Sequence, residues 1–400
     1  MKEILISGMG MVSALGYNVG ENLYSLRRNR SGIEPLRYLQ TSHTEFPVGE
    51  VKMTNEGMMF LLDISENEPT TRTALMGMLA VREALQTANL WKIGNLRIAF
   101  INGTTVGGMD KSEQFYIDFI ENDTKNAYIS THDCGACTEM IADYFGIFSQ
   151  VDTISTACSS AANAIVLGAE LLKSGRADIV VAGGSECITK FHLNGFNTLM
   201  ILDREPCRPF DATRAGLNLG EGAAYIVMET AECFQKRKAN FPPLCELKGY
   251  ANTCDAFHQT ASSPNGEGAY LAMKQAIEDA QLTVEQIDYI NAHGTGTTNN
   301  DLSEGTAIMR LFGENIPLVS STKSFTGHTT SAAGGVEAVI SILALSHNFI
   351  PANLNFSSQM PELPFAPATN QQPTKPIRHI LSNSFGFGGN DTSLIFSKTN

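Results

Sequence analysis

Residues 151–175 read VDTISTACSSAANAIVLGAELLKSG, and they predict a strand, a turn and a helix in immediate succession. The β-branched residues at the start, Val151 and Ile154, are typical of a strand. Apolar residues then recur at helical spacing until a cationic last turn and a glycine cap: Ala161, Ile165, Ala169, Leu172, Lys173 and Gly175. Cys158 therefore lies at a strand-to-helix turn, among Ser, Thr and Ala residues that leave room around its sulfur.

The position of Cys158 predicts a reactive thiol. Unpaired N–H groups and the positive end of the helix dipole favour an anion, so a cysteine there is expected to ionise more readily than a free thiol. The alternative is that Cys158 is simply a small buried hydrophobic residue, which is the better interpretation for the other seven cysteines. Residues elsewhere in the chain must decide between the two.

The composition describes a globular chain of 400 residues, 43% hydrophobic and 17% charged, long enough for one large domain or two core-bearing halves. A net charge of -13 argues against nucleic acid or an anionic membrane surface as the main partner. No uninterrupted apolar run approaches the ~20 residues of a membrane helix, and the apolar start is patterned as a strand and turn. We expect a cytoplasmic protein, and eight scattered cysteines agree with a reducing compartment.

Strand-like and helix-like segments alternate along the chain. The predicted strands are 3–10, 96–105, 177–186, 223–230, 285–294, 317–324 and 392–398, and the predicted helices are 71–89, 161–175, 266–281 and 334–348. This alternation predicts an α/β fold with a mostly parallel sheet between helical layers. A Pro-containing stretch at 240–243 is the best boundary, giving two comparable halves, 1–242 and 243–400.

Two partial motifs are discounted. Gly8 and Gly10 follow an apolar run as in a dinucleotide loop, but Ser13 stands where the third glycine belongs. Cys134 and Cys137 have zinc-ligand spacing, but no second such pair completes a set of four ligands.

Three later segments can supply partners for Cys158. NAHGTGTTNND places His293 after an apolar strand, in a loop rich in Gly and Thr. SSTKSFTGHTTSAAGG carries Lys323 and His328 between a strand and a helix, and residues 385–389 (FGFGG) form a glycine-rich loop able to point N–H groups at a ligand. A thiol, two histidines, a lysine and such a loop indicate acyl chemistry.

Two classes of enzyme could use this set. A cysteine hydrolase needs one histidine to exchange a proton with the sulfur, and it needs neither a second histidine nor the lysine. A thioester-condensing enzyme needs both histidines: the sulfur holds an acyl group while two imidazole N–H donors stabilise the enolate of a second thioester.

Four ordered segments, TACSSAANAI, NAHGTGTTNND, SSTKSFTGH and NSFGFGGND, resemble the signature segments of β-ketoacyl-acyl-carrier-protein synthases, and the resemblance covers essentially the whole chain. It implies a thiolase-like fold of two similar α/β halves in five layers, αβαβα, usually assembled as a dimer. It also implies decarboxylative condensation of an acyl group on Cys158 with malonyl-acyl-carrier protein, giving a 3-oxoacyl product and carbon dioxide. No metal ion or organic cofactor is implied.

The resemblance also assigns roles to individual residues. His293 and His328 would bind the malonyl thioester carbonyl, Lys323 would tune and orient His328, and Glu337 would support Lys323. Backbone N–H groups of Cys158 and Phe387 would form the oxyanion hole. Further positions are the gate over the cysteine at Phe387, the loop near that gate at Phe385, Gly386, Gly388 and Asn390, and the acyl pocket at Val106.

The sequence departs from the fatty-acid members of the family in two places. Asn390 and Asp391 stand where those members usually carry Thr-Asn, and the segment 199–208 is shorter. We therefore favour a specialised synthase, for instance of an aryl-polyene or other pigment pathway, in which a catalytically empty sister subunit could replace the second copy of a homodimer.

Other members of the superfamily remain as alternatives. A non-catalytic chain-length subunit would be expected to lack Cys158, and a thiolase would need a second reactive cysteine beyond Cys254, the last in this chain. The expected partner, an acidic acyl-carrier protein, requires a basic patch, for which the chain offers Arg27, Arg28, Arg204, Arg208 and the KRK at 236–238.

Overall fold

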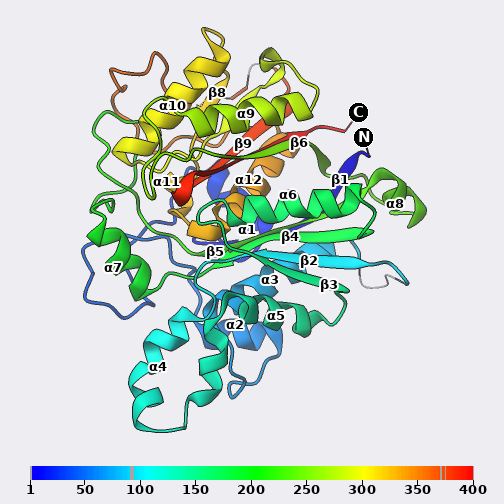
Figure 1. Cartoon of the computed structure of the whole chain (residues 1–400), viewed down its shortest axis with the longest axis vertical. Coiled ribbons are helices and arrows are strands. Elements are labelled where there is room, and N and C mark those ends of the chain that lie inside the picture. Colours follow the sequence, from blue (N-terminus) through cyan, green and yellow to red (C-terminus); the bar gives the residue numbers. More distant parts are fainter. Residues whose placement is uncertain (1, 91–93, 370–371, 374, 400) are drawn as a thin grey trace.

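Ten hydrogen-bonded strands run through the computed structural model in the order β3-β2-β4-β5-β1-β6-β10-β9-β7-β8 (Figure 1). The structure describes residues 2–90, 94–369, 372–373 and 375–399. The strands are β1 (Ile4–Ser13), β2 (Ile98–Gly103), β3 (Gln150–Ile154), β4 (Ile179–Glu186), β5 (Gly222–Thr230), β6 (Cys245–Cys254), β7 (Tyr289–Asn291), β8 (Leu318–Ser320), β9 (His379–Gly386) and β10 (Asn390–Ser397).

The helices connect these strands and cover their faces. They are α1 (Val19–Arg27), α2 (Asn55–Leu62), α3 (Arg72–Thr87), α4 (Met109–Glu121), α5 (Cys134–Phe145), α6 (Ser160–Lys173), α7 (Lys190–Thr198), α8 (Ala231–Lys236), α9 (Glu267–Asp279), α10 (Thr298–Phe312), α11 (Lys323–Thr326) and α12 (Ala333–His347). Short 3-10 turns are η1 (Asn126–His132), η2 (Val284–Gln286), η3 (Thr330–Ala332) and η4 (Phe387–Gly389).

The strand order repeats within the chain. The first half follows β1-β5-β4-β2-β3 and the second follows β6-β10-β9-β7-β8, with the same sequence of antiparallel and parallel neighbours. The halves meet where β1 pairs with β6 through Leu5 with Glu246 and Ile6 with Cys245. Equivalent strand ends therefore lie on the two sides of one pseudo-twofold axis.

The expectation of a mostly parallel sheet is wrong. β2 pairs in parallel with β3 and β4, and β7 with β8 and β9, but every pairing between β4 and β9 along the sheet is antiparallel. One physical reason lies at Phe387–Gly389, the short turn between β9 and β10. Three residues cannot hold the crossover that parallel strands require, so they form a hairpin.

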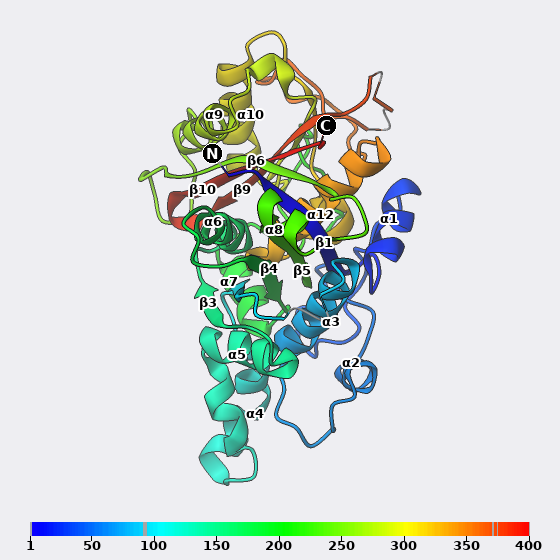
Figure 2. The ribbon, with the colours of Figure 1, turned by 90° about the vertical axis from the view of Figure 1, so that its right-hand side faces the viewer.

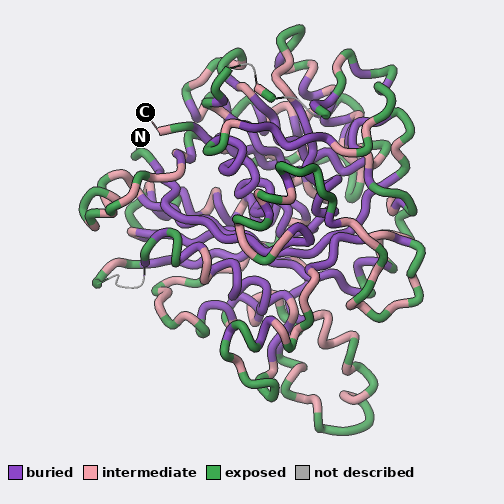
Figure 3. The backbone as a smooth tube through the Cα atoms, turned by 180° about the vertical axis from the view of Figure 1, so that it is seen from behind, coloured by how far each residue is buried: buried purple, intermediate pink, exposed green. Residues whose placement is uncertain are grey.

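The helices and strands form five layers, as the resemblance implies. Figure 2 shows α9 and α10 above the strands of the second half, α6 and α12 between the two sets of strands, and α3 and α5 below the first half. Three large buried apolar clusters fill the spaces between these layers, and the largest surrounds α6 and α12. Figure 3 shows this buried interior, with α4 projecting from it as a helix that has no buried residue.

Small residues allow α6 and α12 to pack closely at their N-terminal ends. A Cβ atom at Gly334 would lie 2.7 Å from Ala162 N, and one at Gly335 would lie 3.4 Å from Ala161 Cβ. A Cβ atom at Gly103, the end of β2, would lie 2.5 Å from Ala161 N. The run of Ser and Ala after Cys158 is therefore needed because three elements converge there.

Glycines also explain the N-terminal segment that resembles a dinucleotide loop. Gly8 and Gly10 lie inside β1, which continues to Ser13, and α3 packs directly on them. A Cβ atom at Gly8 would lie 2.5 Å from Ala84 O. These glycines therefore permit close helix-on-strand packing.

Among the described residues, one helical stretch, Thr330–His347, is long and apolar enough to cross a membrane, and 89% of it is buried inside the fold. It contains η3 and α12. Because α12 contacts strands of both halves, its apolar character is explained by its place in the central layer.

The central position of α12 makes its buried side chains sensitive to shortening. Leu343→Ala removes a side chain that is 2% exposed, and we expect a loss of about 2–5 kcal/mol of unfolding free energy in urea denaturation. Leu61→Ala, at a position that is 45% exposed on α2, is the matched control and should cost less than about 1 kcal/mol. Equal losses in the two variants would contradict the central role of α12.

Candidate active site

Cys158 occupies a sharp turn between β3 and α6. The residue before it, Ala157, has a φ of 52°, in the left-handed region that non-glycine residues rarely adopt. Ser160 fixes the turn, because its Oγ accepts from Thr156 N at 2.9 Å and donates to Ala157 O at 2.6 Å. The sequence prediction of a cysteine at a strand-to-helix turn is confirmed.

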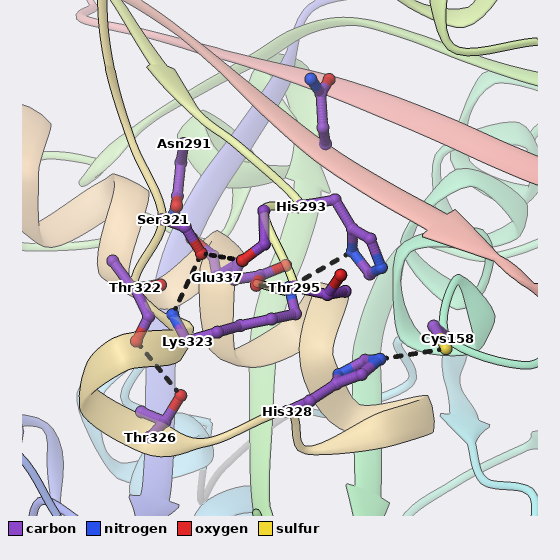
Figure 4. Close-up of polar contacts among 12 residues, drawn as sticks. Cys158, Asn291, His293, Thr295, Ser321, Thr322, Lys323, Thr326, His328 and Glu337 are labelled. Carbon is purple, nitrogen blue, oxygen red and sulfur yellow. Dashed lines mark hydrogen bonds and ion pairs between the residues drawn. The ribbon is translucent and has the colours of Figure 1, made fainter. Parts of the chain in front are cut away.

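His328 contacts the cysteine directly, with 3.1 Å between His328 Nε2 and Cys158 Sγ (Figure 4). Its backbone is fixed on both sides: His328 N donates to Asn218 O at 2.7 Å, and Gly220 N donates to His328 O at 2.9 Å. The segment around Asn218 thus positions the histidine, which gives a structural role to residues 208–224, RPFDATRAGLNLGEGAA.

His293 follows β7 and lies beside His328. The ring centroids of His293 and His328 lie 5.3 Å apart at an interplanar angle of 85°. Nδ1 of His293 lies 3.2 Å from Lys323 Nζ, and Lys323 also forms a buried ion pair with Glu337 (Figure 4). This ion pair supports the expected role of Glu337 as a partner of Lys323.

The expected contact of Lys323 with His328 was wrong, although the lysine charge does lower the pKa of His328. The lysine was expected to orient His328, but its ammonium group contacts His293, while Nδ1 of His328 has no hydrogen-bond partner among the described residues. The reason is geometric: Lys323 begins α11 behind the loop that follows β7, whereas His328 comes after α11 and turns toward Cys158. Sequence order gives no information about which histidine the ammonium group reaches.

These contacts set the proton positions on the two imidazoles. An ammonium group can only donate, so Nδ1 of His293 accepts and the ring proton lies on Nε2. Nothing comparable locks His328, so both of its neutral tautomers are available. Burial, followed by the charge of Lys323, holds the pKa of both His293 and His328 well below the usual range, and both rings are neutral at pH 7.

The thiol is harder to ionise than its place at a helix N-terminus predicted. Burial raises the pKa of Cys158 to about 11, although the charge of Lys323 and a backbone hydrogen bond from Phe387 both favour the thiolate. Desolvation therefore outweighs the local positive potential. The resting site is a neutral thiol beside a neutral imidazole, so its nucleophile must lose a proton to a base during attack.

The cysteine and the two histidines lie close enough together to form a set of metal ligands. Their sulfur and ring nitrogens lie within 4.8 Å of one another, and this is a spacing that a soft cation could use. The same three side chains are those expected for acyl chemistry.

A buried carboxylate that the sequence analysis missed holds the His293 loop. Glu304, on α10, accepts from His293 N at 2.9 Å and from Gly294 N at 2.8 Å. Asn383, on β9, donates to the same carboxylate at 3.0 Å. An acidic residue at helical spacing among polar neighbours looks like a solvated face, so the sequence contains no signal for this role.

A cavity of about 290 Å³ leads to the sulfur. Cys158, His293, His328 and the loop 385–389 line it, together with Phe196 of α7. The Phe387 ring is stacked on Phe196, with centroids 5.9 Å apart, so these two rings form one wall of the cavity.

The glycine before Phe387 allows the loop to approach the cysteine. A Cβ atom at Gly386 would lie 3.2 Å from Cys158 N, so glycine keeps that amide accessible. Gly388 has a φ of 80°, which glycine adopts without strain. Phe385 lies beside His293, with ring centroids 6.0 Å apart, and Asn390 begins β10.

Val106, the expected acyl-pocket residue, is 2% exposed and does not line this cavity. Its backbone N–H donates to Glu186 at 3.3 Å, and the side chains of Thr104 and Thr105 donate to the same carboxylate. The role of Val106 in an acyl pocket stays a prediction.

Several candidate docking residues already have partners within the chain. Arg208 pairs with Asp203 at 3.1 Å, and Arg237, in the middle of the KRK segment, pairs with buried Glu229 at 2.7 Å. Arg27 lies over the Phe349 ring at 5.6 Å. These contacts reduce the free positive charge that the sequence offered for a carrier protein.

Comparison with known proteins identifies the family. A model described as Beta-ketoacyl synthase, N-terminal domain matches residues 1–233, and one described as Beta-ketoacyl synthase, C-terminal domain matches residues 244–357. The chain belongs to the β-ketoacyl synthase family, and it is a 3-oxoacyl-acyl-carrier-protein synthase, an acyltransferase. The exact boundary at 242 and 243 stays a prediction.

Individual relatives span the full chain. A 3-oxoacyl-acyl-carrier-protein synthase 2 of Staphylococcus aureus (strain N315) is 32% identical over 411 residues, covering 99% of this chain and 98% of the relative. Nodulation protein E of Rhizobium meliloti (strain 1021) is also 32% identical, over 408 residues and 99% of both chains.

Solved structures confirm the thiolase-like fold of the family. The ishigamide ketosynthase/chain length factor matches with a TM-score of 0.92 at 29% identity, covering 100% of both chains. A ketosynthase solved in complex with its chain length factor, from Xenorhabdus doucetiae, matches with a TM-score of 0.87 at 32% identity, covering 100% of this chain and 98% of the other.

The position of Glu304 generates a prediction. Glu304→Ala leaves two buried backbone N–H groups without an acceptor, at about 1–3 kcal/mol each, and frees the loop that carries His293. We expect condensation to fall by about 10- to 100-fold, while iodoacetamide still alkylates Cys158 at the wild-type rate. Glu278→Ala, at an exposed position on α9, is the control and should leave both rates unchanged. Wild-type condensation in Glu304→Ala would show that the loop needs no carboxylate.

Proposed function

We propose that Cys158 accepts an acyl group and that His293 and His328 stabilise the enolate formed from malonyl-acyl-carrier protein, which then attacks the acyl group. The observation that carries this assignment is the convergence of Cys158 Sγ, His293 and His328 at one end of the cavity. The condensation reaction itself follows from family membership.

Acyl transfer is the first half-reaction. As the thiol attacks the acyl thioester, His328 Nε2, 3.1 Å away, accepts its proton, in the tautomer with hydrogen on Nδ1. The carbonyl oxygen gains negative charge and receives hydrogen bonds from the backbone N–H groups of Cys158 and Phe387. Collapse breaks the bond to the carrier thiol, and that sulfur leaves with the proton from His328.

Condensation is the second half-reaction. The malonyl thioester oxygen accepts from Nε2–H of His293, which Lys323 holds in that tautomer, and from His328 once its own proton lies on Nε2. The carbon–carbon bond to the carboxylate breaks, carbon dioxide leaves, and the electron pair forms an enolate. The carbanion carbon attacks the acyl carbonyl, the bond to sulfur breaks, and the Cys158 thiolate takes up a proton from solvent.

Separate roles for the cysteine and the histidines lead to a prediction for the half-reactions. Cys158→Ala should abolish condensation but retain malonyl decarboxylation, because the histidine pair survives. His293→Ala should retain acyl transfer to Cys158 and lower condensation by about 10²–10³-fold, the usual effect of losing one oxyanion donor. Intact mass measures the acyl adduct, and released carbon dioxide measures decarboxylation.

The half-reaction experiment has two outcomes that would contradict the assignment. Formation of elongated product by Cys158→Ala would show that Cys158 is not the nucleophile. Equal loss of acyl transfer and condensation in His293→Ala would show that the role of His293 is not limited to condensation.

We propose further that the enzyme acts in a specialised polyketide or aryl-polyene pathway, paired with a related chain-length subunit. Support comes from the two solved relatives whose names include a chain length factor, and from the departures at Asn390 and Asp391. Fatty acid elongation by a homodimer is the second candidate, supported by the Staphylococcus aureus synthase at 32% identity. An acyl-carrier protein is the proposed donor in both, and a cytoplasmic location stays a prediction.

A panel of acyl-carrier-protein thioesters distinguishes these pathways. We expect an adduct that depends on Cys158 to form faster from unsaturated or aromatic acyl groups than from saturated ones of equal length, with Cys158→Ala as control. A preference for long saturated chains by the protein alone would favour fatty acid elongation.

The other two candidate classes have less support. A cysteine hydrolase required His328 and Lys323 to be remote from the sulfur, but His328 contacts it at 3.1 Å. A non-catalytic chain-length subunit has no use for the intact set of Cys158, His293 and Lys323.

A further inference from the structure

A buried acidic residue lies directly behind the turn that faces the catalytic cysteine. Asp391 is the second residue of β10, two positions after the turn Phe387–Gly389, and it is 5% exposed. Its carboxylate points at the backbone of Gly268, the second residue of α9, where any side chain would collide with Asp391 Oδ2. This carboxylate replaces the amide that the fatty-acid members usually carry.

Asp255 also lies against the backbone of Gly268. A side chain at Gly268 would also meet Asp255 Cβ, at 2.8 Å, so the two aspartates share one small space. Asp255 N donates to Gly389 O at 2.9 Å, and its Oδ2 accepts from Ser263 N at 2.7 Å. Asp255 therefore joins the Phe387–Gly389 turn to the segment 255–263, part of which lines the catalytic cavity.

The groups that face Asp391 are mainly acidic. Burial, then the charges of Asp255 and of Glu304 on α10, raise the pKa of Asp391 to about 8. The nearby ends of α9 and β6 carry Glu267 and Cys254, and Glu267 is paired with Arg310 of α10 at 2.9 Å. Asp391 is therefore protonated at neutral pH, and its O–H requires an acceptor.

An acceptor without a partner lies in the same space. Oδ1 of Asp255 is buried and has no hydrogen-bond partner among the described residues. A hydrogen bond from protonated Asp391 to this oxygen satisfies both groups at once, as in other pairs of carboxyl groups that hold one proton between them.

We propose that Asp391 is a positioning residue: by sharing its proton with Asp255, it holds the Phe387–Gly389 turn over Cys158, and loss of that proton to solvent releases the turn. This inference deepens the proposed function, because it rests on the backbone N–H of Phe387 serving the acyl group on Cys158.

Release of the turn has two opposite consequences. When both carboxyl groups are ionised, their repulsion separates β10 from the segment 255–263, and the Phe387 N–H leaves the sulfur. Condensation then slows, because an oxyanion donor is misplaced. At the same time the sulfur becomes more accessible to a small reagent, because the wall formed by Phe387 and Phe196 opens.

The test compares wild type with Asp391→Asn between pH 6.5 and pH 9.5. One assay measures iodoacetamide alkylation of Cys158, read from its own peptide because Cys254 is exposed. The other measures condensation. Each rate is expressed as the ratio of wild type to variant. The effect of thiol ionisation on the rate is common to both proteins and therefore cancels in this ratio.

Above about pH 8 we expect the condensation ratio to fall, by up to about tenfold per pH unit, and the alkylation ratio to rise. Asp255→Asn removes the same repulsion, so the ratio of wild type to this variant should change in the same way. Glu278→Gln, which changes an exposed carboxylate further along α9, is the matched control and should follow wild type at every pH.

Flat ratios for both aspartate variants would overturn the proposal, as would ratios that change in the same direction in the two assays. Should Asp391→Asn fail to fold, Asp255→Asn tests the same pair. Alkylation needs no acyl donor, so absent condensation with the chosen thioesters would count against the proposed substrates, while the alkylation ratio would still decide the role of Asp391.

Discussion

The close packing of α6 on α12 is the constraint on which the rest of the structure depends. A Cβ atom at Gly334 or Gly335, at the start of α12, would meet the backbone or Cβ atoms of Ala162 and Ala161 at the start of α6. Cys158 precedes one helix and His328 precedes the other, so this packing brings Sγ and Nε2 to 3.1 Å although 170 residues separate them. A larger side chain where α6 meets α12 would push the two helices apart and so move Cys158 away from His328.

The repeated topology gives each half a different chemical task at equivalent strand ends. The turn after β3 supplies the thiol, and the equivalent turn after β8 supplies Lys323 and His328. His293 comes from the end of β7, the counterpart of β2. The first half therefore contributes the nucleophile, and the second contributes the groups that handle protons and negative charge.

Burial controls the electrostatics of the site. Lys323 and Glu337 are each 2% exposed and form an ion pair, and burial raises the pKa of Glu337 to about 7 although the lysine charge opposes that shift. Burial and the same ammonium group keep the pKa of His293 low, so the ring is neutral, and the ammonium group fixes its tautomer. His293 is thereby prepared as a hydrogen-bond donor for a developing enolate. The helix N-terminus beside Cys158 has a smaller effect than desolvation, which explains why the thiol stays protonated.

Local sequence determined the strand, turn and helix around Cys158, because β-branched and helical periodicities and small residues act over a few neighbours. The four ordered motifs were enough to indicate the family, the five layers and the set of Cys158, His293, Lys323 and His328. Only the tertiary structure decided the antiparallel centre of the sheet, the contact of Lys323 with His293, the role of Glu304 and the raised pKa of Cys158. Each of these depends on burial or on distances between segments far apart in the chain, and such quantities have no local signature in sequence.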